Sequence, residues 1–206
     1  MSSQARYVRG NCNPKPLACD PSYPIEVGDL LFREPSNGLA RPASAMAGQG
    51  SETLNQQTFH DVFLGVALQK NGVQPAPGGG SPYTQPAETW PIGSTGNHSP
   101  ANVIEAATTG IFVFPLSSAA SYNGGEFIGP AGATTLANQQ VKTAAAGAAG
   151  SIGRASPSAA AIGQQAQQLG TAIPPVLVNY VEVEIESTIF YGGEQSYVVG
   201  SSSGTP

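Results

Sequence analysis

The chain has 206 residues, of which only 10% are charged, whereas about 25% is typical of globular proteins. Its net charge is −5 and its pI is about 4.9, which argues against nucleic acid as a partner. The 26 Gly and 18 Pro residues disfavour long helices and favour turns, loops and extended segments. This composition is typical of either a secreted or a structural β-protein.

The first ten residues, MSSQARYVRG, lack the apolar segment of a secretory signal peptide. No run approaches the 18 apolar residues that a membrane-spanning helix requires. We therefore expect synthesis in a cytoplasm and no membrane partner.

Residues 1–24 are predicted to form an extended N-terminal arm. Their four prolines fix the backbone and remove N–H donors, so we expect no pairing into a central strand. Deleting the arm is expected to leave a folded body. The arm carries the expected partner-binding residues, which are Arg6, Tyr7, Arg9 and Lys15. With no acid among the first 19 residues, docking in an acidic protein groove is one interpretation, and solvated charges are the other.

The arm also holds the chain's two cysteines, Cys12 and Cys19. Their spacing matches no zinc module, and a reducing cytoplasm disfavours a disulfide between them. We expect free thiols, with a disulfide as the alternative, and neither a metal nor a cofactor.

Residues 25–191 are predicted to be a β-rich body. Residues 25–32 and 39–46 flank the turn sequence PSNG and predict a hairpin. Residues 47–58 are polar and are expected to be a loop. Residues 59–69 predict a strand, in which Gly65 and Ala67 indicate the close approach of a neighbouring layer.

Residues 74–101 contain six prolines and a Gly-Gly-Gly run, which predict a long surface loop. A loop of this length commonly has a purpose, such as gripping a neighbour. Tyr83 and Trp90 are the candidate contact residues, and the alternative is that Trp90 folds back on its own body.

Residues 103–116, VIEAATTGIFVFPL, predict a hairpin around Thr108-Thr109-Gly110, and EFIGPAG predicts a short strand. The region 131–172 is interpreted as an Ala/Gly/Gln-rich insertion with short strands at Val141 and Ile152–Arg154 and a short helix after Ser158. The tail, 192–206, is expected to be mostly flexible, although Tyr197–Val199 is a candidate to pair on a sheet edge.

Residues 176–191 carry the clearest strand pattern. Val181, Val183 and Ile185 alternate with Glu182, Glu184 and Glu186, which predicts one buried and one solvated face. The glutamate stripe is either solvated, a contact for the basic arm of a neighbouring subunit, or a weak calcium chelator. Seven or eight short strands predict an all-β fold, a small β-barrel or β-sandwich.

No catalytic constellation is visible. His60 and Asp61 are adjacent on the expected strand and point to opposite faces, and His98 has no nucleophile elbow near it. Gly78–Gly80 precedes Pro rather than a helix and lacks the Lys-Ser/Thr of a phosphate-binding loop. We therefore expect a protein that is not an enzyme.

The order of these motifs resembles the head decoration, or cement, proteins of tailed bacteriophages. The matching elements, which span about residues 25–190, are GDLLF, SNGLARPAS, FLGVAL, ATTGIFVFPL, GEFIGPAG, SIGRAS and YVEVEIES. The loop 74–101 and the Ala/Gly/Gln-rich region depart from the family pattern as insertions.

The resemblance implies a β-barrel-like body that assembles as a homotrimer on the outer capsid surface of a virion and clamps neighbouring major capsid subunits. Multivalent weak contacts are sufficient for that role. A receptor- or glycan-binding module, such as a fibre tip that uses Tyr83, Trp90 and His98, is the alternative, and copy number per virion discriminates the two.

Overall fold

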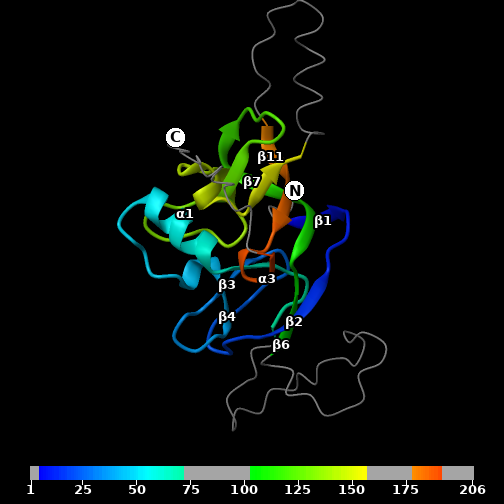
Figure 1. The fold of residues 1–206 in the computed structure, drawn as a ribbon, viewed down its shortest axis with the longest axis vertical. Coiled ribbons are helices and arrows are strands. Elements are labelled where there is room, and N and C mark those ends of the chain that lie inside the picture. Colours follow the sequence, from blue (N-terminus) through cyan, green and yellow to red (C-terminus); the bar gives the residue numbers. More distant parts are fainter. Residues whose placement is uncertain (1–4, 72–102, 157–177, 192–206) are drawn as a thin grey trace, which may run out of the picture.

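The computed structural model describes residues 5–71, 103–156 and 178–191 (Figure 1). Strands take up 43% of these residues and helices 16%. The predicted all-β fold class is confirmed. The predictions for Tyr83, Trp90, His98, the helix after Ser158 and the tail lie outside the described residues.

The first sheet closes on itself. Its strands are β1 (Arg6–Arg9), β7 (Thr109–Ala120), β8 (Phe127–Pro130), β9 (Val141–Thr143), β10 (Gly153–Ala155) and β11 (Val178–Glu186), in the order β1-β7-β11-β10-β8-β9. A parallel pairing of Leu116 with Val141 joins β7 to β9. Strands β7, β11, β10, β8 and β9 therefore form a small closed barrel. Strand β1 pairs with β7 but is not part of the closed ring (Figure 1).

The second sheet has five antiparallel strands. They are β2 (Pro14–Ala18), β3 (Leu30–Arg33), β4 (Ala40–Pro42), β5 (Phe63–Ala67) and β6 (Val103–Ala107), in the order β2-β6-β5-β3-β4. A single parallel bridge between Cys19, just after β2, and Ala40 of β4 links the two outer strands of this sheet. The helical segments are 3₁₀ turns at Ala43–Ala45 and Gly147–Gly150 and the α-helices α1 (Glu52–Asp61) and α3 (Thr188–Tyr191).

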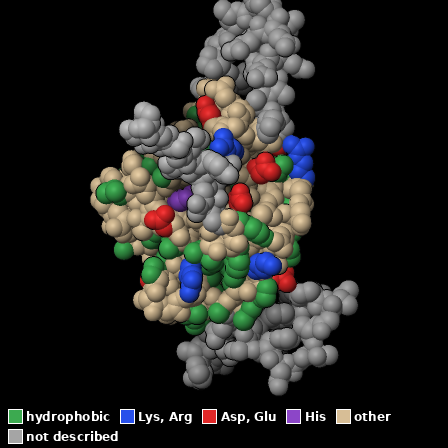
Figure 2. Space-filling model, in the orientation of Figure 1, with side chains coloured by type: hydrophobic (Ala, Val, Ile, Leu, Met, Phe, Trp, Pro, Cys, Tyr) green, Lys and Arg blue, Asp and Glu red, His purple; other side chains and the backbone are tan. Residues whose placement is uncertain are grey.

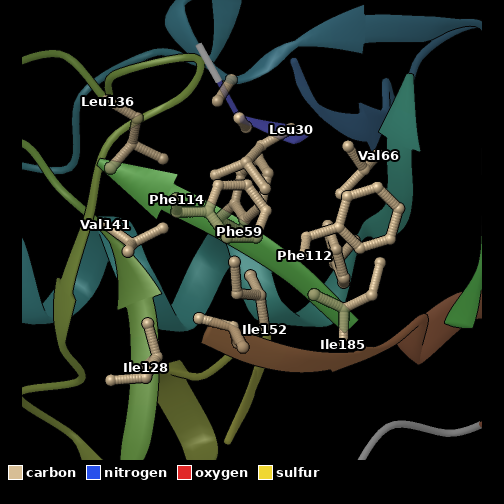
Figure 3. Close-up of a cluster of buried hydrophobic side chains, with 14 of the residues drawn as sticks. Leu30, Phe59, Val66, Phe112, Phe114, Ile128, Leu136, Val141, Ile152 and Ile185 are labelled. Carbon is tan, nitrogen blue, oxygen red and sulfur yellow. The ribbon is translucent and has the colours of Figure 1, made fainter. Parts of the chain in front are cut away.

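Two hydrophobic clusters stabilise these sheets. The larger fills the barrel and extends to one face of the second sheet, and it includes Phe59 of α1 and Phe112 and Phe114 of β7 (Figure 3). The smaller contains Cys19, Ile25 and Ile104. Strand β5 contributes to both clusters, so it is buried on both faces.

Several locally encoded elements are confirmed. β11 buries Val181, Val183 and Ile185, each 2% exposed or less, and leaves its glutamates half-buried or exposed. The hairpin around PSNG is present as β3 paired with β4. The short strands expected near Phe127, Val141 and Gly153 are β8, β9 and β10.

The loop expected over residues 47–58 is wrong, because most of it is the helix α1. Ser51 caps the helix by accepting a hydrogen bond from the Leu54 N–H. Asn55 and Gln56 are fully buried, and their amides bond to the backbone of the segment 130–145. Two of the three buried side chains of the helix are amides and the third is Phe59, so the sequence shows no hydrophobic periodicity.

The hairpin expected over residues 103–116 is also wrong. β6 and β7 follow one another but belong to different sheets, and the chain crosses between the sheets at the buried Thr108. Their antiparallel partner is the N-terminal segment: β1 pairs with β7 and β2 pairs with β6. Residues 6–18 and 103–113 therefore form one antiparallel ribbon that runs through both sheets.

The N-terminal segment is extended, as expected, but it does not stand apart from the body. At its start, Ala5 is buried, and its N–H donates to the Gln139 side chain at 3.1 Å. At its end, Cys19 is buried, and the Asp20 carboxylate accepts from Arg41 at 2.8 Å. Because this segment supplies an outer strand to each sheet, the body does not begin at Ile25.

Deleting residues 1–24 is therefore expected to destabilise the body, contrary to the expectation from the sequence. The deletion removes β1, β2 and buried side chains of both clusters, so we expect a loss of at least about 3 kcal/mol in the free energy of unfolding. Denaturant unfolding monitored by tyrosine and tryptophan fluorescence measures it. A protein lacking only residues 1–4 is the control, and equal stability of the two variants would contradict the integration of this segment.

Gly65 lies close to another backbone, but this backbone is the adjacent strand β6 of the same sheet rather than the neighbouring layer expected from the sequence. A Cβ at this residue would lie 2.1 Å from the Ala107 carbonyl oxygen, and its φ is +145°. The backbones of β5 and β6 touch here, beside the crossing at Thr108.

Replacing Gly65 with Ala is predicted to destabilise the protein by about 3 kcal/mol or more, since both the clash and the backbone conformation penalise a side chain. Gly125→Ala is the matched control, because Gly125 also has a positive φ (+86°), but a Cβ there would have no neighbour within 4 Å. The control is predicted to lose only about 1 kcal/mol. Equal melting temperatures for the two variants would show that the contact at Gly65 is loose.

Candidate interaction surface

The outer face of the barrel brings the basic N-terminal strand next to the glutamate stripe. Across β1, β7 and β11, Arg6 aligns with Val113 and Glu182. Acidic and basic side chains lie next to one another over β11 and towards β1 (Figure 2). The stripe therefore faces arginines of its own chain, whereas the alternative expected from the sequence was the arm of a neighbouring subunit.

A second row crosses five strands. Arg9, Ile111, Glu184, Arg154 and Phe127 occupy paired positions on β1, β7, β11, β10 and β8. The guanidinium of Arg154 lies 4.1 Å from the centre of the Phe127 ring, a cation–π contact. Arg154 is thus the direct cross-strand neighbour of Glu184, whereas Ile111 separates Glu184 from Arg9.

The ion pair between Arg9 and Glu182 is exposed. Its N–O distance is 3.4 Å, and the Arg9 side chain is 55% exposed. Aromatic packing holds β1 more firmly, because the Tyr7 ring meets Phe112 edge-on with centroids 5.5 Å apart. The Tyr7 hydroxyl also donates to the Gly10 carbonyl.

An open depression of about 460 Å³ borders this surface. Its lining includes Asn11, Thr109, Arg154, Glu184 and Glu186. Among the described residues, no group of three His, Cys, Asp or Glu is placed to hold a metal ion. The depression has mixed charge, which suits contact with a polar partner surface.

Lys15 is separated from the other basic residues. It lies half-buried on β2 in the second sheet, between Pro14 and Pro16. The structure therefore brings Arg6, Tyr7 and Arg9 together on β1 and leaves Lys15 elsewhere. Tyr83 and Trp90 are outside the described residues.

Both cysteines and His60 make contacts within the fold. Cys12 and Cys19 are both free thiols, and they contact different hydrophobic clusters. Burial raises the pKa of the Cys19 thiol. His60 lies on α1 with its Nδ1 2.6 Å from the Ser151 carbonyl oxygen, which ties the helix to the barrel.

The sequence does not predict which residues lie beside the glutamate stripe, namely Arg154, Ile111 and Phe127. They are isolated in short segments, and only the register between strands aligns them with Glu184. The period-two pattern of β11 is the one local signal, and it indicates the stripe without its partners.

The comparisons with known proteins found no matching family model, no similar curated protein and no similar solved structure. No helix within the described ranges is long and apolar enough to cross a membrane.

We predict that Tyr7→Ala destabilises the protein by about 1–2 kcal/mol, since it removes an edge-on aromatic contact and apolar burial. Glu182→Gln is predicted to cost less than about 1 kcal/mol, because the ion pair is exposed to solvent. Chemical denaturation of both variants measures the difference. A larger loss for Glu182→Gln would mean that charge, rather than packing, holds β1.

Asp20 and Asp29 are predicted to have pKa values below and above that of an ordinary aspartate, respectively. The Ser22 N–H, helped by Arg41, lowers the pKa of Asp20, so its stabilisation is lost as pH falls through that lowered pKa. Burial raises the pKa of Asp29, despite hydrogen bonds from Glu26 and Gln139. The stability that Asp29 contributes is present at low pH and is lost as pH rises through its raised pKa.

Carbon-detected NMR of the two carboxyl groups as a function of pH measures these values. A pKa for Asp29 at or below that of Asp20 would contradict the burial of Asp29 and the hydrogen bond that Asp20 accepts from the Ser22 N–H.

Proposed function

We propose that this protein is a structural virion protein, a capsid decoration or cement protein that binds across neighbouring major capsid subunits as a homotrimer. The resemblance of its motifs to phage head decoration proteins supports the proposal. The structural observation that supports it most strongly is the basic strand β1, in which all four residues are solvent-exposed.

The surface chemistry fits contact with another protein. Arg6 and Arg9 project from a strand that Tyr7 holds against Phe112, so the basic groups are presented by an ordered element. Ordering them in advance reduces the entropy cost of binding. Arginine is also enriched at protein interfaces, and many such contacts on a repeating lattice add through multivalency.

The first test measures copy number. In purified particles that contain this chain, quantitative mass spectrometry against the major capsid protein is expected to give hundreds of copies per particle. A few copies per particle would contradict decoration and favour the alternative, a fibre-tip or glycan-binding module.

Sedimentation equilibrium of the purified protein is expected to give the mass of three chains.

The second test measures the contribution of β1. The double variant Arg6→Glu/Arg9→Glu is expected to bind empty heads at least about tenfold more weakly in a sedimentation assay, because like charges oppose an acidic capsid groove. Arg33→Glu is the matched control, since Arg33 is an exposed arginine on the second sheet. Equal binding of wild type and the double variant would remove β1 from the interface.

A further inference from the structure

The sequence contains three Asn-Gly pairs, at Asn37, Asn71 and Asn123. In such a pair the backbone nitrogen of glycine can attack the side-chain amide carbon of asparagine, because glycine has no side chain that obstructs the approach. Asparagine is among the thermolabile residues of proteins. Whether a given pair reacts depends on how firmly the fold holds the two groups.

The side chain of Asn71 is held firmly. It is 2% exposed, its Oδ1 accepts from the Ile25 N–H at 2.7 Å, and its Nδ2 donates to the Tyr23 carbonyl at 2.8 Å. Turning the amide carbon towards the following residue would break both bonds and leave buried polar groups unpaired, which is costly. The fold therefore protects this pair.

Exposure does not separate the other two pairs, because both residues of the Asn37 pair and both residues of the Asn123 pair are exposed. Hydrogen bonding does separate them. The Gly38 N–H donates to the Glu34 carbonyl at 2.8 Å, and Asn37 Oδ1 accepts from the Leu39 N–H at 3.0 Å. The attacking nitrogen at this turn must give up a hydrogen bond, so ring closure is opposed.

The turn at Asn123 leaves its attacking nitrogen free. Within residues 5–71, 103–156 and 178–191, the Gly124 N–H has no acceptor, although its neighbours are bonded: Gly125 donates to the Ala155 carbonyl at 2.8 Å and Glu126 to the Asn123 carbonyl at 3.2 Å. The Asn123 amide donates to Glu126 Oε1 at 3.0 Å, and this bond is exposed. An exposed bond is readily exchanged for water, so the side chain is free to turn towards Gly124.

We propose that Asn123 is the Asn-Gly pair of this chain that deamidates spontaneously in the folded protein. The Gly124 nitrogen forms a bond to Asn123 Cγ, the Cγ–Nδ2 bond breaks, and Nδ2 leaves as ammonia with the proton of the Gly124 N–H. Water then opens the five-membered imide. Breaking the new N–Cγ bond gives aspartate, and breaking the original peptide bond gives isoaspartate.

The reaction would change the charge beside the candidate interaction surface. Arg154 Nη1 donates to the Gly125 carbonyl at 3.4 Å, and the Arg154 guanidinium lies over the Phe127 ring. A carboxylate at position 123 adds a negative charge to the turn that Arg154 contacts, and isoaspartate also lengthens its main chain by one carbon. The proposal does not rest on the capsid role, because the reaction needs only this chain and water.

Peptide mass spectrometry after incubation of the full-length protein at mildly alkaline pH tests the proposal. Cleavage after glutamate places the three asparagines in separate peptides. We expect Asn123 to convert at least about tenfold faster than Asn37, and Asn71 to convert most slowly, because protected groups react only when the fold opens locally. Conversion of Asn37 as fast as Asn123 would overturn the proposal.

The same measurement in concentrated urea is the control for the fold. We expect the three rates to converge to within a few-fold there, because no hydrogen bond then distinguishes the pairs. An unchanged order and spread of rates in urea would assign the difference to neighbouring residues and would also overturn the proposal.

The variant Gly124→Ala tests the attacking atom. Gly124 is not among the glycines with positive φ, so alanine is compatible with its backbone, but the added methyl group obstructs ring closure. We expect conversion at Asn123 to slow at least about fivefold, while conversion at Asn37 in the same sample is unchanged. An unchanged rate at Asn123 would contradict attack by the Gly124 nitrogen.

Discussion

The antiparallel ribbon of residues 6–18 with residues 103–113 is the constraint on which the rest of the fold depends. The two segments cross between the sheets together, and Thr108 holds the crossing. Its N–H donates to the Cys12 carbonyl at 3.0 Å, its hydroxyl donates to the Asn13 carbonyl at 2.8 Å, and its carbonyl accepts from the Ser187 N–H at 2.8 Å. Burial of these polar groups is tolerated because each is hydrogen-bonded.

The ribbon also determines the surface. It places β1 against β7 in the register that aligns Arg6 and Arg9 with the glutamates of β11. A basic segment that the sequence presents as a separate arm is thereby an ordered strand of the first sheet, paired with the barrel strand β7. This arrangement explains how an acidic protein presents an ordered pair of arginines at its surface.

The parts of the fold predictable from sequence are those with local signals. The alternation of Val183 with Glu182 and Glu184 predicts β11, and the PSNG turn predicts the β3–β4 hairpin. The ribbon has no such signal, because its strands are separated by about 90 residues and Pro14 and Pro16 are unfavourable to pairing. A Pro on an outer strand is compatible with a sheet when its missing N–H faces away from the partner, and β2 lies at such a position.

The two errors at residues 1–24 and 103–116 therefore have one origin. The apolar runs either side of Thr108 look like a local hairpin, whereas each pairs with the N-terminal segment instead. Likewise, the row from Arg9 to Arg154 depends on a register that no single segment encodes. Long-range pairing is set by the burial of Phe112 and Ile104 in two different clusters, which is a property of the assembled fold.

Cross-strand nuclear Overhauser effects on isotope-labelled protein test the ribbon most directly. We predict contacts between the backbone protons of Tyr7 and Phe112 and between those of Leu17 and Ile104, in the paired register. Contacts between Ala106 and Phe112, with residues 6–18 showing no cross-strand contacts, would instead indicate a local hairpin with a detached arm and would contradict the ribbon.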